Sequence, residues 1–242
     1  MEDAALSATS VRLFGQDRAM SSTTSDNGLQ LINGPDTAPA TLLLAHGAGA
    51  PMDSPFMETI ASGLGERGWR VLRFEFPYMA RQRLSGRRSA PDRQPKLLDC
   101  FREQVALAAG RAPLLIGGKS MGGRMASLLV DELAPAGVCG CLCLGYPFHP
   151  PGKPEQLRTE HLAVLQSPTL ILQGERDSFG KRAEVESYSL SQQLELAWLP
   201  SGDHSFKPTR SSGLNEADNL AAAVALSDGF IRRCLERRGV AG

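Results

Sequence analysis

The chain has 242 residues, of which 42% are hydrophobic, so it can bury the core of one domain of ordinary size. It contains 26 basic and 26 acidic residues, and a formal net charge of zero gives no general attraction for nucleic acid or for an anionic membrane. Five cysteines, an odd number, and a polar start without an apolar leader indicate reduced thiols in a cytoplasmic protein with no membrane segment.

Strand and helix patterns alternate along most of the chain. Residues 1–27 are polar with one weak strand candidate at 11–14, so we expect a partly mobile segment there and a single domain over 28–242. Apolar runs predict strands at 29–32, 41–45, 71–76, 114–118, 138–144, 169–173 and 195–199, and helical periodicity predicts helices at 55–67, 97–109, 120–133 and 215–238. This order predicts an α/β fold with a mostly parallel, doubly wound sheet, helices on both faces and functional loops at the carboxyl ends of the strands.

The stretch 113–124, PLLIGGKSMGGR, holds the most informative motif. Gly118, Ser120 and Gly122 spell G-x-S-x-G between a buried strand and a helix, which is the pattern of a nucleophile elbow. The strained turn exposes the serine hydroxyl, and the glycines let strand and helix approach closely. Gly-Lys-Ser also ends phosphate-binding loops, but Pro113 replaces the first glycine of that motif and the residues between are typical of a strand, so nucleotide binding is disfavoured.

An acid and a histidine follow this serine, each just past a later strand. A serine hydroxyl is a poor nucleophile that needs a base, and the base needs an acid to orient it. Asp177 and His204 supply the order serine, acid, histidine that α/β-hydrolases use. We therefore predict a triad of Ser120, Asp177 and His204, with Glu175 as the fallback acid and Asp203 shaping the histidine loop.

Such a serine enzyme also needs N–H donors for the negative oxygen of its tetrahedral intermediate. The N–H of Met121, directly after the nucleophile, is the first predicted donor. The second is expected from the small residues that follow the strand at 41–45, where we favour the N–H of Ala48, with Gly47 as the alternative. His46 in the same loop is expected to brace it.

Five short motifs together resemble the α/β-hydrolase superfamily. They are HGAG at 46–49, FEFPY at 74–78, GKSMGG at 118–123, GERD at 174–177 and GDHSF at 202–206. More narrowly, the set is similar to a small dienelactone-hydrolase-like group of predicted hydrolases related to animal testis-expressed proteins, from about residue 42 to the closing helix. The resemblance implies the fold and a Ser120, Asp177, His204 triad, but no substrate. Dienelactone hydrolases use a cysteine nucleophile, so the serine argues against their particular reaction.

The segment from 78 to 96 is strongly basic and is expected to form a loop on the catalytic side of the sheet. Our hypothesis is that Tyr78, Arg81 and Arg83 bind a carboxylate or phosphate of the substrate, with Lys119 adding to the positive field. The alternative, a solvated loop balanced by acids elsewhere, has equal weight.

Two further segments bear on the pocket and on metal binding. Residues 146–166, where related hydrolases insert a cap, are short and proline-rich, with one or two helical turns near 155–162, so we expect a minimal cap and an open pocket. For His161 in this segment we favour an ordinary surface role over a place at the border of the pocket. Cysteines 139, 141 and 143 alternate along one strand, so we expect them to share a face and to pack in the core, with no metal site.

These patterns predict a serine hydrolase that cleaves a small ester, thioester or amide through an acyl-enzyme on Ser120. Its partner would be a small acyl substrate, with an anionic one among the candidates, and no metal or organic cofactor is implied. Two alternatives stay open. An acyltransferase would use the same triad with an acceptor other than water, and a catalytically silent interaction module would keep the fold without the chemistry.

Overall fold

The computed structural model describes residues 10–11, 20–25, 28–110 and 113–239. Its nine-stranded sheet has the order β1-β2-β3-β5-β4-β6-β7-β8-β9. The strands are β1 Ser10–Val11, β2 Met20–Ser25, β3 Gly28–Asn33, β4 Thr41–Ala45, β5 Arg70–Phe74, β6 Leu114–Lys119, β7 Val138–Leu144, β8 Thr169–Gly174 and β9 Leu194–Leu199. The six neighbouring strands β5, β4, β6, β7, β8 and β9 are parallel to one another. The strands β3, β2 and β1 continue the sheet beyond β5 as an antiparallel edge.

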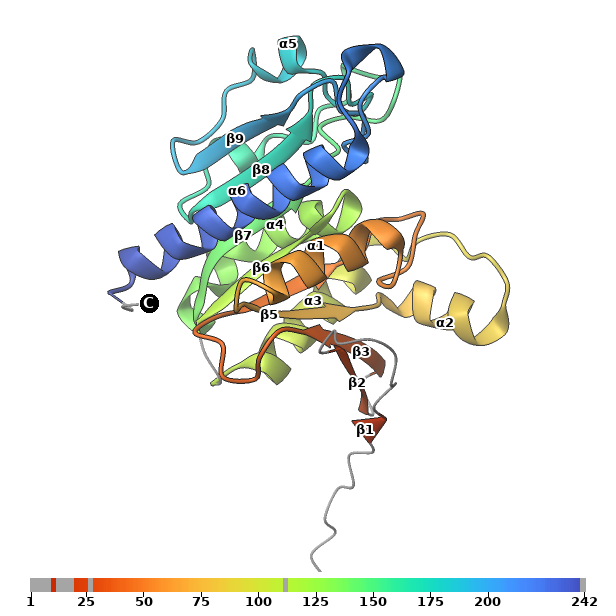
Figure 1. Cartoon of the computed structure of the whole chain (residues 1–242), viewed down its shortest axis with the longest axis vertical. Helices are drawn as coiled ribbons and strands as arrows, with labels where there is room; N and C mark the ends of the chain where they lie inside the picture. The colour runs from red at the N-terminus through yellow and green to blue at the C-terminus, as the bar shows by residue number, and fades with distance from the viewer. Residues whose placement is uncertain (1–9, 12–19, 26–27, 111–112, 240–242) are drawn as a thin grey trace, which may run out of the picture.

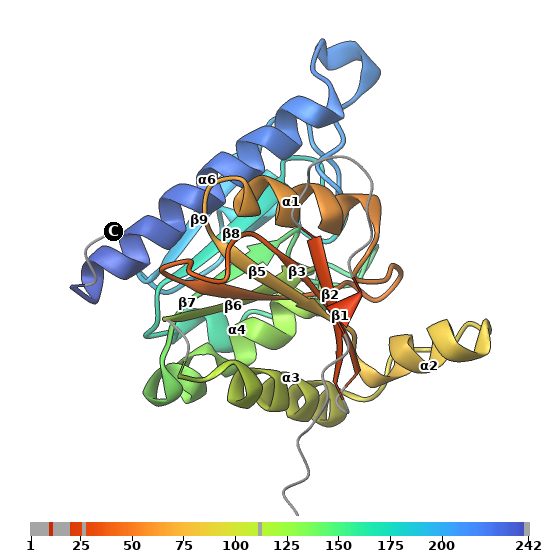
Figure 2. The same cartoon turned by 60° about the horizontal axis from the view of Figure 1, so that its bottom comes forward.

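Helices cover both faces of this sheet (Figures 1 and 2), as the alternating sequence pattern predicts. They are α1 Pro55–Gly65, α2 Pro77–Ser85, α3 Gln94–Ala108, α4 Met121–Leu133, α5 Arg182–Val185 and α6 Glu216–Arg237, with short 3-10 turns at Ala134–Ala136, His161–Ala163 and Arg210–Ser212. One core layer lies between the sheet and α3 with α4, and the other between the sheet and α1 with α6. Strands such as β4 are buried along their whole length because both of their faces are covered.

The basic segment differs from the loop that the sequence predicts. It begins with helix α2, which has Pro77 at its first position and is capped after Ser85 by Gly86, a residue in the left-handed region with a φ of 66°. The helix was missed because it has little apolar periodicity, and its Leu84 side chain is 89% exposed. Figure 1 shows α2 extending away from the body of the domain.

The short segment after β7 also differs in detail from the prediction. Instead of one or two helical turns near 155–162, it consists of turns followed by the 3-10 turn His161–Ala163. The prolines before it interrupt helical hydrogen bonding. The minimal cap expected from the sequence is therefore even less regular in the structure.

The three cysteines of β7 do not share one face. The pairing of β7 with β6 shifts register between Leu114 and Ile116, and such an extra residue reverses the side to which the chain points. Cys141 and Cys143 therefore lie in the core layer under α3 and α4, with their Sγ atoms 3.7 Å apart, whereas Cys139 lies in the layer under α1 and α6. All three are buried, as expected, but the common face was a wrong prediction.

The start of the chain is described only in part. Within residues 1–27 the structure describes Ser10–Val11 and Met20–Ser25, which pair with each other as β1 and β2. The rest of the strand candidate at 11–14 lies outside the described residues, so the mobility of this segment and the domain boundary at residue 28 stay predictions. Of the helices in the described ranges, none has the length and apolar character that crossing a bilayer requires.

Candidate active site

The turn between β6 and α4 consists of Ser120 alone. Its φ of 51° and ψ of −114° form a conformation that costs a residue with a side chain about 1–3 kcal/mol. The flanking glycines make the turn possible, because a Cβ on Gly118 would lie 2.6 Å from the carbonyl carbon of Gly122, and one on Gly122 would lie 2.6 Å from the oxygen of Ala45. The sequence thus folds into the strained elbow that its G-x-S-x-G pattern predicts.

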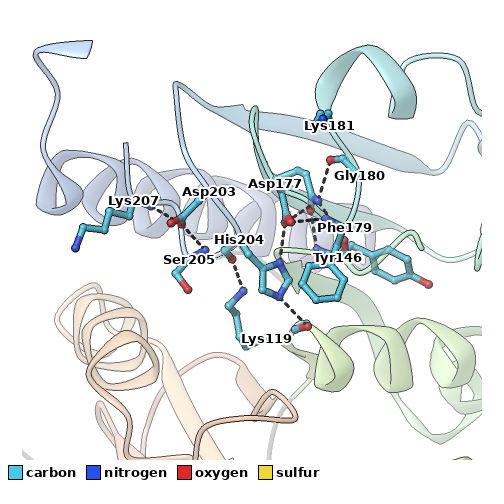
Figure 3. Close-up of polar contacts among 12 residues, drawn as sticks. Lys119, Tyr146, Asp177, Phe179, Gly180, Lys181, Asp203, His204, Ser205 and Lys207 are labelled. Atoms are coloured by element: carbon cyan, nitrogen blue, oxygen red, sulfur yellow. Dashed lines mark hydrogen bonds and ion pairs between the residues drawn. The ribbon is translucent and has the colours of Figure 1, made fainter. Parts of the chain in front are cut away.

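The side chains of Ser120, His204 and Asp177 meet at the carboxyl ends of their strands. His204 Nε2 lies 2.9 Å from Ser120 Oγ, and His204 Nδ1 lies 2.8 Å from Asp177 Oδ2. Figure 3 shows the imidazole between Asp177 and the start of α4. Because the carboxylate oxygen accepts a hydrogen bond, we assign the proton to Nδ1, which leaves Nε2 to accept from the serine hydroxyl.

Asp177 is fully buried and each of its oxygens receives a further donor. Its Oδ1 accepts from the N–H of Phe179 at 2.9 Å, and its Oδ2 accepts from Gln173 Nε2 at 2.9 Å. A buried carboxylate would be costly without these partners. Sequence reasoning missed the role of Gln173, although a polar residue at the end of an otherwise apolar strand was the available signal.

The loop that carries His204 is held from several sides. Asp203 Oδ1 accepts from the N–H groups of Ser205 at 2.8 Å and Lys207 at 3.1 Å, in keeping with the loop-shaping role expected for it. The ring of Phe179 lies 4.3 Å from the imidazole. Together these contacts fix the direction of the imidazole without closing it off, since 24% of the His204 side chain is exposed.

Glu175, the fallback acid, has other partners. It accepts from the N–H of Ser201 at 2.8 Å and from Arg182 Nη1 at 3.0 Å. The structure therefore brings the carboxylate of Asp177, and not that of Glu175, to the histidine.

Lys119 lies beneath the histidine loop. Its buried Nζ donates to the carbonyl oxygen of His204 (Figure 3). The same Nζ lies 5.2 Å from the ring centroid of Phe56 and 5.9 Å from that of Phe206. Burial is the larger influence on the pKa of Lys119 and lowers it to about 8, and the negative charges of Asp177 and Asp203 oppose this shift only in part. The ammonium group thus supports the histidine loop from inside the protein.

The small-residue loop after β4 runs beside Ser120. A Cβ on Gly47 would lie 3.7 Å from Ser120 Cβ. The carbonyl of Gly47 accepts from His46 Nδ1 at 2.7 Å, and His46 Nε2 accepts from the N–H of Phe76 at 3.1 Å, so His46 has the contacts of a bracing residue. Because a trans peptide is planar, the N–H of Ala48 points away from the side on which the Gly47 carbonyl is held. Met121 is the first residue of α4, where the N–H has no partner within the helix.

The residues predicted to bind substrate in the basic segment all have protein partners. The hydroxyl of buried Tyr78 donates to the carbonyl oxygen of Ala48 at 3.1 Å, so it supports the small-residue loop. Arg83 donates to both oxygens of Asp53 at 2.9 Å and to Glu75 at 2.6 Å. Arg81 donates to Asp92 at 2.8 Å. Within the described ranges, no group of three or more His, Cys, Asp or Glu side chains is arranged to hold a metal ion.

Solved structures of similar fold come from several bacteria. The chain is similar to a serine hydrolase without a lid from Xanthomonas campestris, with 20% identity and a TM-score of 0.62 over 92% of this chain and 97% of that one. A dienelactone hydrolase from Anabaena variabilis has 20% identity and a TM-score of 0.63 over 94% and 96%, and an esterase domain from Rhodothermus marinus has 18% and 0.61 over 94% and 99%. At these identities the likeness establishes the fold alone.

The likeness extends to the sequence of most of the chain. A family model for the alpha/beta hydrolase domain matches residues 38–232. That range includes the elbow, the small-residue loop and the loops of Asp177 and His204. The chain therefore belongs to the α/β-hydrolase family.

Proposed function

We propose that this protein is a serine hydrolase that cleaves a small ester, thioester or amide through an acyl-enzyme on Ser120. The observation that carries the proposal is the position of the His204 imidazole, 2.9 Å from Ser120 Oγ and 2.8 Å from Asp177 Oδ2. Proton transfer between a nucleophile and its base requires a hydrogen-bond distance, and both of these distances are within that range.

In the first half of the reaction, Ser120 Oγ attacks the acyl carbon and its proton passes to His204 Nε2. The N–H groups of Met121 and of Ala48, with Gly47 as the alternative, stabilise the negative oxygen of the tetrahedral intermediate. When the intermediate collapses, His204 gives the proton to the leaving group and the acyl group stays on Ser120. Asp177 keeps the imidazole in its orientation and stabilises the cation that forms.

In the second half, a water molecule attacks the acyl-enzyme. His204 Nε2 takes a proton from the water, and the new tetrahedral intermediate uses the same N–H donors. Its collapse releases the acid, and the proton returns to Ser120 Oγ. The partial exposure of His204 is consistent with access of water to this position.

Two measurements test the proposal. A fluorophosphonate probe should label the wild-type protein covalently, and Ser120→Ala should abolish the labelling. A panel of p-nitrophenyl esters and acyl thioesters should then show turnover that depends on Ser120. A folded wild-type protein that neither reacts with the probe nor hydrolyses any member of the panel would contradict the proposal and favour a binding module.

A further inference from the structure

Two arginines beside the elbow, Arg124 and Arg158, form no ion pair with a carboxylate among the described residues, unlike Arg81 and Arg83 of the basic segment. Arg124 lies in the first turn of α4, and its Nη1 donates to the neutral side chain of Gln94 at 3.0 Å. Its Nε is buried and has no hydrogen-bond partner among the described residues. An unsatisfied buried donor on a cation is costly, and the Nε atoms of Arg70 and Arg73 share this state. Because Nε is buried while the residue as a whole is only half-buried, a ligand would meet Arg124 through its Nη atoms.

The second arginine is Arg158, which belongs to the segment after β7. Burial lowers the pKa of Arg158, and the charge of Arg124 lowers it further. The carbonyl oxygens of both arginines accept from one polar cluster: Ser127 Oγ donates to that of Arg124 at 2.9 Å, and the hydroxyl of Tyr146 donates to that of Arg158 at 3.1 Å. His161 Nε2 lies 2.9 Å from Ser127 Oγ and 3.4 Å from the Tyr146 hydroxyl, so the cluster makes the two arginines neighbours. Two like charges held together in a partly buried place have a stronger field than the same charges in water.

The side chains around this pair are neutral. Ser127 Oγ lies 2.9 Å from His161 Nε2, and the hydroxyl of Tyr146 donates to the carbonyl oxygen of Arg158 at 3.1 Å. Burial, with the charge of Arg124 as a smaller cause, lowers the pKa of His161 to about 4, so this imidazole is uncharged at neutral pH. His161 thus belongs to a polar cluster, and the surface role expected from the sequence is wrong.

The arginine pair lies at the same edge of the sheet as the proposed nucleophile. The N–H of Arg124 donates to the carbonyl oxygen of Ser120 at 3.0 Å, and residues four apart on a helix share a face. The N–H of Ser120 donates to the carbonyl oxygen of Leu144 at 3.0 Å, two residues before Tyr146. One arginine therefore follows the elbow directly, and the other is tied to the strand next to it.

We propose that Arg124 and Arg158 bind a carboxylate on the substrate. The preferred substrates are then half-esters or half-thioesters of dicarboxylic acids, or esters whose leaving group carries a carboxylate. The inference rests on the proposed serine hydrolase. A guanidinium group presents paired donors that match the two oxygens of a carboxylate, and neither arginine has a carboxylate partner among the described residues. Binding a carboxylate would relieve the repulsion between the two cations.

Matched substrates test this inference. One is the mono-p-nitrophenyl ester of glutaric acid, and its control is the same molecule with the free acid masked as a methyl ester. A second pair is 3-acetoxybenzoate and methyl 3-acetoxybenzoate, which moves the acid to the leaving group. For at least one pair, the wild-type enzyme should have a higher kcat/KM for the acid than for the masked substrate. Arg124→Gln or Arg158→Gln should lower the ratio of these two kcat/KM values by about 10–100-fold, which corresponds to the loss of one charged hydrogen bond.

Arg88→Gln is the matched control, because it removes one positive charge from an exposed position of the basic segment. In this variant the ratio of kcat/KM for the acid to that for the masked substrate should stay within about twofold of the wild-type ratio, since exposed charges are screened by salt. The inference is wrong if neither arginine variant changes the ratio for either pair, or if Arg88→Gln or Arg81→Gln lowers it as much.

A labelling experiment on the wild-type protein covers the case in which a variant fails to fold. Glutarate at millimolar concentration should slow fluorophosphonate labelling of Ser120, whereas the neutral glutaramide should not. Equal behaviour of the two compounds would overturn the inference. Normal labelling and turnover of the masked esters would still support the proposed function, and absence of both would refute that function instead.

Discussion

Two groups of cations are candidates for an anion site, and they differ in their partners more than in their number. The group in the basic segment, represented by Arg81 and Arg83, is exposed or half-exposed and paired with Asp53, Glu75 and Asp92. The group near the elbow, which consists of Lys119, Arg124 and Arg158, is buried or partly buried and has no carboxylate partner among the described residues. Lys119 donates to the carbonyl oxygen of His204, and Arg124 donates to the amide oxygen of Gln94. The comparison teaches that density of arginine in a sequence does not locate an anion site, because carboxylates from other parts of the chain can neutralise the charge, as they do at Arg81 and Arg83.

The comparison has functional meaning only if the elbow group borders an active nucleophile. The largest expected effect therefore comes from Asp177→Asn, which should lower kcat by about 10⁴-fold because the amide no longer holds the productive tautomer of His204. Steady-state kinetics on a p-nitrophenyl ester measures this, with circular dichroism to verify the fold. A loss below tenfold would mean that Asp177 has no such part in the reaction.

Lys119→Met tests the support that the elbow group gives to the histidine loop. Loss of the hydrogen bond to the His204 carbonyl should lower kcat by about 10-fold, the value of one hydrogen bond to a charged donor. KM should change less, because Lys119 is buried and the substrate is not expected to touch it.

The same variant has a signature in stability against pH. The pKa of Lys119 is about 8 in the folded protein and about 10.4 in the unfolded chain, so between these values the unfolded state binds the extra proton. The free energy of unfolding should therefore contain a contribution that rises by about 3 kcal/mol as pH increases from 8 to 10.4. Denaturant titrations across this range should show the rise in wild type and its loss in Lys119→Met; identical slopes would contradict the assignment.

Arg83→Ala should affect stability and leave substrate preference alone. The Glu75 side chain is only 3% exposed, so removal of its partner leaves a nearly buried carboxylate and should cost about 2 kcal/mol in the free energy of unfolding. The ratio of kcat/KM for glutarate half-ester to its methyl-masked form should not change. A selective loss on the acidic substrate would instead favour the basic segment as the anion site.

Arg81→Ala is expected to have the smallest effect. Its ion pair with Asp92 includes a side chain that is 51% exposed, and such pairs contribute about 0–1 kcal/mol. Thermal melting should shift by no more than a few degrees. If this variant destabilised the protein more than Arg83→Ala does, the expectation that ion pairs with a nearly buried carboxylate contribute more stability than exposed pairs would be wrong for this segment.

Much of the fold follows from local patterns. Apolar runs such as 41–45 and 114–118 identify buried strands, because a strand covered on both faces excludes polar side chains. Helix α2 escaped prediction since it has no apolar face, and only its terminal proline and glycine indicate its ends. The face of Cys139 could not be predicted either, because a shift in strand register depends on the neighbouring strand.

By itself, the sequence determined the order of serine, acid and histidine past the ends of successive strands. Parallel strands direct their carboxyl ends to one edge, so residues 120, 177 and 204 were expected to meet there. Only the tertiary structure decided which cations have partners. Arg83 meets Asp53 across 30 positions, whereas Arg124 meets neutral Gln94 across the same separation. Charge compensation is a property of contacts between distant residues, and no local pattern encodes it.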